Sequence, residues 1–151
     1  MGRKYSVNLF ISQKAAAGDL VQIASASTKV TKITAIHVEQ SSDYGDAQAE
    51  GLRLNVSRGT AGTGGTALTS RPISPTDAAF AGTILGQNTT AMTSPVVQVE
   101  GGMNVQGGWH WTPPMGYEME VAPSAAIALV LVTAPIDGID MEITILFEEL
   151  G

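Results

Sequence analysis

Apolar and polar residues alternate along most of this chain with a period of two. In the clearest case, Ile139, Met141 and Ile143 alternate with Asp140 and Glu142. Because successive side chains of a strand point to opposite faces, this pattern predicts strands with one buried and one wet face. The chain as a whole predicts about eight strands, at residues 5–11, 20–23, 30–40, 52–56, 95–100, 104–112, 125–133 and 139–148.

The connections between these segments are rich in Gly, Pro, Asp and Asn, the residues that favour turns. Short strands separated by frequent turns are typical of an antiparallel β-sandwich or barrel. We therefore expect an all-β sandwich that buries two inner faces against each other. The 151 residues of the chain fit a single domain at 1–151.

One short helix is predicted within residues 74–81. Ser74 is a good N-cap, Pro75 suits the first helical position, and Asp77 lies three residues after the cap. Gly82 would end the helix. We expect this segment to close one open end of the sandwich.

Composition narrows the functional classes. Hydrophobic residues make up 44% of the chain and charged residues only 15%, and there is no cysteine. The charged fraction lies below the roughly 25% of ordinary soluble domains, so the surface is expected to contact partners. The absence of cysteine excludes disulfides, thiolate metal sites and a cysteine nucleophile.

The charges are unevenly distributed along the chain. All eight Lys and Arg lie within residues 3–71, whereas residues 72–151 carry nine acids and no base. Either this asymmetry steers the protein onto a charged partner or onto another copy, or the fold mixes the two parts in space. In the first case residues 1–4 are a candidate arm, with Arg3, Lys4 and Tyr5 as candidate contacts.

Membrane and nucleic-acid partners are not expected. The longest apolar run, residues 125–132, is far shorter than the roughly 20 residues that span a bilayer. The alternating, polar-interrupted start of the chain is read as a strand rather than as a signal peptide. No basic cluster lies on a periodic element, as duplex nucleic acid would require.

The stretch GGWHWTPP, residues 107–114, holds both tryptophans. In a strand, Trp109 and Trp111 share one face and His110 points to the other. We interpret the pair mainly as core or inter-subunit packing, because large aromatic side chains bury much surface. A sugar-stacking platform is the alternative, and a catalytic role for His110 has no supporting motif.

Other candidate sites are weaker. His37 lies two residues from Glu39 and suggests an ion pair, and the acids Asp43, Asp46 and Glu50 do not have the spacing of a calcium loop. The glycine-rich residues 59–65 lack the GK[ST] of a phosphate-binding loop and are expected to form a long flexible hairpin loop. No catalytic, cofactor or metal site is predicted, and we expect a protein that is not an enzyme.

The chain resembles small head proteins encoded in tailed-phage and prophage genomes. The resemblance runs in order along nearly the whole chain. It rests on RKYSV (3–7), QSSDYGD (40–46), EGLRLNVSRG (50–59), the Gly/Thr loop, RPISPTDAA (71–79), NTT (88–90), GGWHW (107–111) and LFEEL (146–150).

This resemblance implies a capsid decoration, or cement, protein. Such proteins are commonly β-sandwiches or jelly rolls, are often trimers, and bind the major capsid protein on the outside of the head. The chain is then expected on the virion surface after synthesis in the cytoplasm of a bacterial host. The expected oligomer and capsid contacts are Arg3, Lys4, Tyr5, Trp109 and Trp111. A carbohydrate- or receptor-binding module of a phage tail is the alternative.

Overall fold

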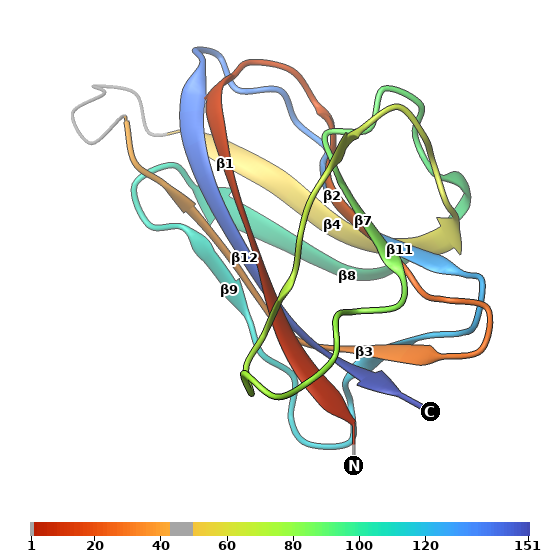
Figure 1. The fold of residues 1–151 in the computed structure, drawn as a ribbon. Helices are drawn as coiled ribbons and strands as arrows, with labels where there is room; N and C mark the ends of the chain where they lie inside the picture. Colours follow the sequence, from red (N-terminus) through yellow and green to blue (C-terminus); the bar gives the residue numbers. More distant parts are fainter. Residues whose placement is uncertain (1, 43–49) are drawn as a thin grey trace.

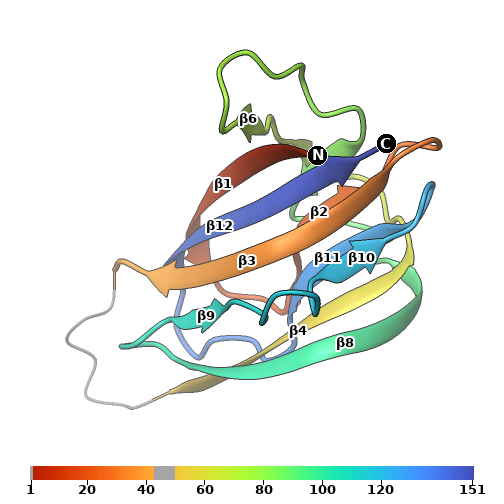
Figure 2. The same ribbon diagram turned by 90° about the horizontal axis from the view of Figure 1, so that it is seen from below.

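The chain folds into two antiparallel β-sheets that pack face to face as a sandwich (Figure 1, Figure 2). The structure, a computed structural model, describes residues 2–42 and 50–151. It contains no helix in these residues, which confirms the all-β prediction. The strands are β1 (Arg3–Lys14), β2 (Gly18–Ala24), β3 (Val30–Gln40), β4 (Gly51–Thr60), β5 (Thr66–Ala67), β6 (Arg71–Pro72), β7 (Thr83–Gly86), β8 (Thr93–Asn104), β9 (Trp109–Trp111), β10 (Met119–Val121), β11 (Ala126–Leu131) and β12 (Ile139–Leu150).

The first four strands alternate between the two sheets. One sheet has the order β10-β3-β12-β1-β6, and β9 also pairs with β3, beside β10. The other has the order β5-β7-β2-β11-β4-β8. In the first sheet β1 pairs with β12 from Arg3 opposite Glu149 to Lys14 opposite Ile139. The two ends of the described chain therefore lie side by side (Figure 1).

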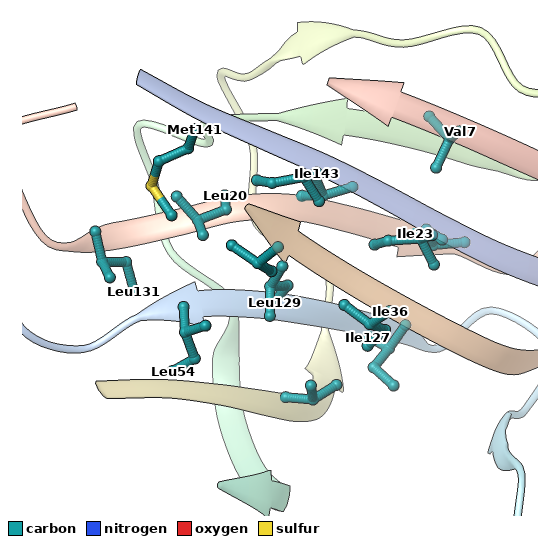
Figure 3. Close-up of a cluster of buried hydrophobic side chains, with 14 of the residues drawn as sticks. Val7, Leu20, Ile23, Ile36, Leu54, Ile127, Leu129, Leu131, Met141 and Ile143 are labelled. Atoms are coloured by element: carbon teal, nitrogen blue, oxygen red, sulfur yellow. The ribbon is translucent and has the colours of Figure 1, made fainter. Parts of the chain in front are cut away.

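The inner faces of both sheets form one apolar core. The alternation in β12 is the reason that Ile139, Met141 and Ile143 face inward, while Glu142 is exposed. Burying each such aliphatic side chain contributes about 1.5–3 kcal/mol. Figure 3 shows part of this cluster, with side chains from both sheets in contact: Val7, Leu20, Ile23, Ile36, Leu54, Ile127, Leu129, Leu131, Met141 and Ile143.

Strand β11 is apolar throughout because both of its faces are covered. Its inward residues Ile127 and Leu129 belong to the main core. Its outward residues Ala126 and Ala128 pack with Met92 in a second, small cluster. Strand β11 is therefore a central strand, between β2 and β4, with both faces covered.

The glycine-rich segment contributes to this outer cover and is not a hairpin loop, so that prediction is wrong. Gln22, buried on the outer side of β2, accepts a hydrogen bond from the Gly62 N–H at 2.7 Å and donates one to the Gly62 carbonyl at 3.4 Å. Thr63 and Thr90 form an antiparallel bridge. A Cβ at Gly62 would lie 2.2 Å from the Thr90 carbonyl oxygen, so this close approach requires glycine.

The helix predicted within residues 74–81 is absent, although the segment does close one end of the sandwich. The Ala78 carbonyl accepts a hydrogen bond from the Tyr5 hydroxyl at 2.8 Å. The Ala81 N–H donates to the buried Glu149 carboxylate at 2.9 Å. The Ala78 carbonyl and the Ala81 N–H are thus bound by side chains of β1 and β12. A helix as short as the predicted one has little stability of its own, so it does not form in competition with these contacts.

An aromatic cluster seals the same end. The Phe80 ring lies 5.7 Å from the Tyr5 ring and 5.0 Å from the Phe147 ring, centroid to centroid. The Tyr5 and Phe147 rings are stacked at 5.4 Å. Such pairs contribute about 0.5–1.5 kcal/mol beyond the area that they bury.

Tyr5→Phe is expected to alter how stability depends on pH. Burial of the phenol, helped by the Glu149 carboxylate, raises the Tyr5 pKa above its usual value. In the unfolded chain the Tyr5 phenol begins to ionise at about pH 10, whereas in the folded protein it still keeps its proton at that pH. The free energy of unfolding therefore falls as the pH rises further. At pH 8 the variant should lose about 1 kcal/mol with the hydrogen bond to Ala78. Denaturant titrations from pH 8 to 11 should show this deficit shrinking, and a constant deficit would contradict the assignment.

Candidate functional site

Both tryptophans point into the sandwich from β9, a short edge strand. Trp109 lies opposite Val38 and Trp111 lies opposite Ile36, which are both buried residues of β3. The two indoles are partly buried and pack against the main core. This confirms the interpretation of the pair as packing, within one subunit.

The two rings do not form one exposed platform. Trp109 lies against β8 at Gly101, where an added Cβ would meet its Nε1 at 2.1 Å. Trp111 instead lines an open groove of about 660 Å³. The strand pattern correctly placed both rings on one face, but it carried no information about which ring the neighbouring strand covers.

The three candidate contacts near the N-terminus, Arg3, Lys4 and Tyr5, differ in their exposure. Arg3 and Lys4 are exposed residues of strand β1, opposite Glu149 and Glu148 of β12, so they do not form a free arm. Met1 lies outside the described residues. Tyr5 is 1% exposed and belongs to the core, so it is not a surface contact.

Basic residues of the first part of the sequence lie beside acidic residues of the second part in the folded chain. Lys32 forms an ion pair with Glu120 at 3.1 Å, and Arg53 lies 3.7 Å from Glu100. The acid-rich β12 runs between β1 and β3, which carry Lys4 and Lys32. Exposed pairs of this kind contribute little stability.

The two histidines meet on the outer face of the first sheet. The rings of His37 and His110 are stacked with their centroids 4.7 Å apart. His110 Nε2 lies 3.1 Å from Glu39 Oε1. Glu39 therefore contacts the histidine on the neighbouring strand, and not His37 two residues away as the sequence suggested.

Of the three acids considered as calcium ligands, only Glu50 lies among the described residues. Asp43 and Asp46 lie outside the described residues. Glu50 accepts a hydrogen bond from the Ile136 N–H at 2.8 Å. Among residues 2–42 and 50–151, no three His, Asp or Glu side chains are grouped so that they could hold a metal ion.

The groove is lined by the β9–β10 connection and by residues of β3, β4, β8, β9 and β10. Figure 2 shows these strands of the two sheets along one side of the sandwich. Its aromatic and proline residues are Trp111, Pro113, Pro114 and Tyr117. Its volume of about 660 Å³ falls in the range of small-molecule sites, roughly 300–1,000 Å³. Unlike most such sites it is open along one side, and it has both polar and apolar walls.

A tight turn presents the exposed aromatic residue of the groove. The Tyr117 N–H donates to the Pro114 carbonyl at 3.0 Å, which closes a four-residue turn. Gly116, the third residue, has a φ of 88°, as a type II turn requires at that position. Tyr117 is thereby held at 77% exposure. Sequence reasoning missed this residue, although the order Pro-Met-Gly-Tyr was a signal for the turn.

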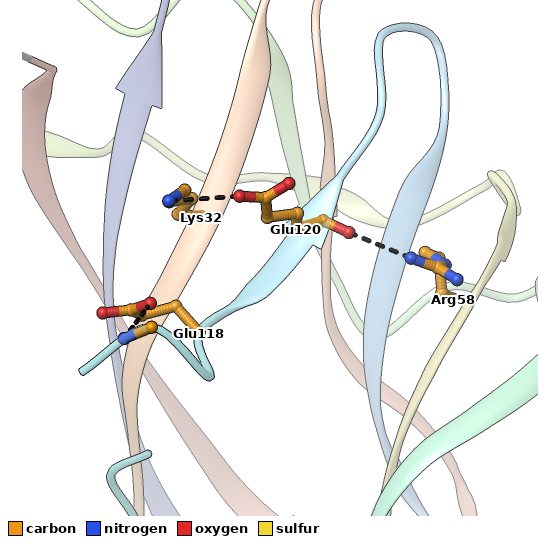
Figure 4. Close-up of polar contacts among 5 residues, drawn as sticks. Lys32, Arg58, Glu118 and Glu120 are labelled. Carbon is orange, nitrogen blue, oxygen red and sulfur yellow. Dashed lines mark hydrogen bonds and ion pairs between the residues drawn. The ribbon is translucent and has the colours of Figure 1, made fainter. Parts of the chain in front are cut away.

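The polar wall is fixed by contacts among its own residues (Figure 4). Lys32 Nζ pairs with the Glu120 carboxylate, and Arg58 Nη1 donates to the Glu120 backbone carbonyl at 3.3 Å. The Gly116 N–H donates to Glu118 at 2.9 Å. The backbone N–H groups of Glu118 and Gly116 lower the pKa of the Glu118 carboxyl, and the Glu120 carboxylate raises the pKa of Lys32.

Several large apolar side chains remain exposed outside the core. Met115 is 95% exposed in the turn beside Tyr117, and Val96 and Val97 are adjacent on the edge strand β8. Ile136 is 73% exposed in the β11–β12 connection. In the part of the chain that the structure describes, the exposed large apolar residues are Phe10, Ile73, Val96, Val97, Met115, Tyr117, Val132 and Ile136.

The described residues contain no helix that is long and apolar enough to cross a membrane. The fold places the chain in the class of all-β sandwich proteins. No protein family, curated protein or solved structure matches this chain.

Proposed function

We propose that this protein is a bacteriophage capsid decoration protein. It binds the outer surface of the major capsid shell and stabilises the head against internal pressure. The proposal starts from the resemblance along the chain, from RKYSV at the start to LFEEL at the end. In this proposal the protein acts on the surface of the virion through the area that it buries against the capsid, and it carries out no catalysis.

The exposed apolar side chains are the observation that carries the proposal. The core of the sandwich is complete without them, and yet Met115 and Ile136 are each more than 70% exposed. Apolar groups exposed at turns and at edge strands are typical of protein contact surfaces. On a chain with only 15% charged residues, they favour a protein that functions in an assembly.

We further propose that the sandwich is a jelly roll. Counting β9 and β10 as one interrupted strand and setting β5–β7 aside, eight main strands remain. Numbered along the chain, they follow the orders 1-8-3-6 and 2-7-4-5, which is the jelly-roll arrangement. Strands β5, β6 and β7 then lie in one long connection between the fourth and fifth main strands, which are β4 and β8. This order supports the proposal, because decoration proteins are commonly of this type.

In this proposal the protein is a homo-oligomer, with a trimer favoured. Its contacts use exposed residues, including Arg3 and Lys4 at one end of β1, and not the tryptophans that pack inside the subunit. A specific contact should bury about 1,200 Å² or more. The adjacent Val96 and Val97 on β8 are suitable apolar contributors.

Phage shells assembled without this protein provide the test. We expect purified protein to run as a trimer in light scattering, to sediment with such shells, and to raise the temperature at which they disrupt. Electron microscopy should then show added density on the outer surface of the shell. Protein that stays monomeric and fails to sediment with shells at micromolar concentration would exclude the proposed function.

Charge reversal tests the end of β1 better than deletion, because Arg3 and Lys4 belong to a paired strand. If that end faces an acidic neighbour, Arg3→Glu and Lys4→Glu should each slow shell binding and weaken its dependence on salt. Arg53→Glu makes the same charge change on the other sheet and should leave binding unchanged. If all three substitutions weakened shell binding equally, the loss of binding would be due to the change in net charge alone.

The alternative, a carbohydrate- or receptor-binding module of a phage tail, rested on Trp109 and Trp111 acting together. Trp109 is turned against Gly101 and lies outside the groove that Trp111 lines. The two tryptophans therefore do not form the joint platform on which that alternative rested.

A further inference from the structure

The groove beside Trp111 is not needed for a decoration role. It combines two aromatic side chains, Trp111 and Tyr117, with several hydrogen-bonding groups among its lining residues. One of these is the Gln98 amide on β8, and the other polar residues are Lys32, Arg58, Glu118 and Glu120. Aromatic faces with converging polar groups in a cleft of this size are the ordinary features of a ligand site.

The charges of this wall balance each other. Two cations, Lys32 and Arg58, stand beside two carboxylates, Glu118 and Glu120. Lys32 is paired with Glu120, and the Glu118 carboxylate is bound by the Gly116 N–H. A strongly charged ligand would have to break these contacts and would find no surplus of opposite charge. The groove is therefore matched to a ligand that is neutral and rich in polar groups.

The polar residues of the groove also provide both hydrogen-bond donors and hydrogen-bond acceptors. Carboxylate oxygens of Glu118 and Glu120 accept, guanidinium and ammonium groups donate, and the Gln98 amide does both. A sugar hydroxyl both donates and accepts, so it can bridge such neighbours. The aromatic faces of Trp111 and Tyr117 are electron-rich and suit the C–H face of a pyranose ring.

We propose that this groove binds an uncharged, pyranose-containing glycan. Tyr117, and the exposed part of Trp111, stack on the sugar rings, and Gln98, Arg58 and Glu118 bind their hydroxyl groups. The type II turn at Pro114–Tyr117 holds Tyr117 in place before the ligand arrives, which limits the entropy lost on binding. The open side of the groove allows a chain of sugars to extend beyond it.

This site is independent of the decoration role, because its readout requires no capsid. A printed array of neutral and acidic bacterial glycans should show binding to at least one neutral glycan. Soluble maltohexaose and cellohexaose serve as defined neutral probes, and the hit from the array is added to them. Tryptophan fluorescence of the full chain should respond to the bound sugar, because Trp111 lines the groove.

Single substitutions locate the binding. Tyr117→Ala removes an exposed side chain and should weaken binding by about tenfold without changing the circular dichroism spectrum. Gln98→Ala should also weaken binding. Met115→Ala is the matched control, since Met115 is in the same turn but does not line the groove.

Three outcomes would overturn the proposal. The first is an array on which no neutral glycan binds at millimolar concentration, or on which acidic glycans alone bind. The second is unchanged affinity in Tyr117→Ala. The third is a proline-rich peptide that binds the groove in the same fluorescence assay while no glycan does, which would make it a peptide site.

Discussion

Phe147→Ala should destabilise the protein by about 3–5 kcal/mol, the usual cost of truncating a buried phenylalanine. Phe147 is 1% exposed and lies between Tyr5 and Phe80, so its loss leaves a cavity and removes two ring contacts. Because domains of this size are stable by about 5–15 kcal/mol, much of the folded-state stability would be lost. We expect the melting temperature to fall by roughly 10 °C in calorimetry.

Phe10→Ala is the control for this prediction. Phe10 lies on the same strand as Tyr5, but it is 56% exposed on the outer face. Its truncation should change the free energy of unfolding by less than about 0.5 kcal/mol. Comparable losses in the two variants would mean that the aromatic cluster does not seal the end of the sandwich as described.

Gly101→Ala should cost about 1–3 kcal/mol through overpacking. Gly101 lies opposite the inward residue Leu54, and Trp109 occupies the space where its side chain would be. The new methyl group would meet Trp109 Nε1 at 2.1 Å, and the indole, packed against the core, has little room to move. Denaturant unfolding measures the loss, and a shift in tryptophan emission should accompany it.

Gly102→Ala is the matched variant one residue further along β8. Gly102 is exposed, and an added Cβ would meet no atom within 4 Å. Because alanine restricts the unfolded chain, this change should be neutral or should stabilise by about 0.4–1 kcal/mol. If both glycines responded alike, Trp109 would not be the cause of the Gly101 effect.

The strands with strong alternation could be predicted from sequence because a half-buried strand imposes that pattern on its residues. Residues 30–40 and 139–148 fall within β3 and β12. The shorter strands β7 and β10 were missed, since Thr83–Gly86 and Met119–Val121 are too brief to display a period. Of the predicted strand at residues 104–112, only Trp109–Trp111 forms β9.

The remaining errors arise from tertiary contacts that local sequence does not encode. The sequence after Ser74 carries helix signals, but Glu149, distant in sequence, binds the Ala81 N–H that such a helix would use. The glycine-rich segment looked like a flexible loop because its anchor, Gln22, lies 40 residues earlier.

The candidate site was predicted only in part. The packing role of Trp111 followed from its size and from the strand period. The groove depends on Gln98 and Arg58, which two other strands bring to it, and on Tyr117, which a turn presents. No spacing in the sequence relates these residues to each other.

The pairing of β1 with β12 sets a condition on how the molecule forms during translation. The ribosome makes β1 long before its main partner β12, so this pairing must wait until the ten strands between them have been made. Contacts between such distant segments make folding slow, because a large loop must close before they form. Until residues 139–150 emerge, the nascent chain exposes an unsatisfied strand, and this is the interval in which chaperones would be most needed.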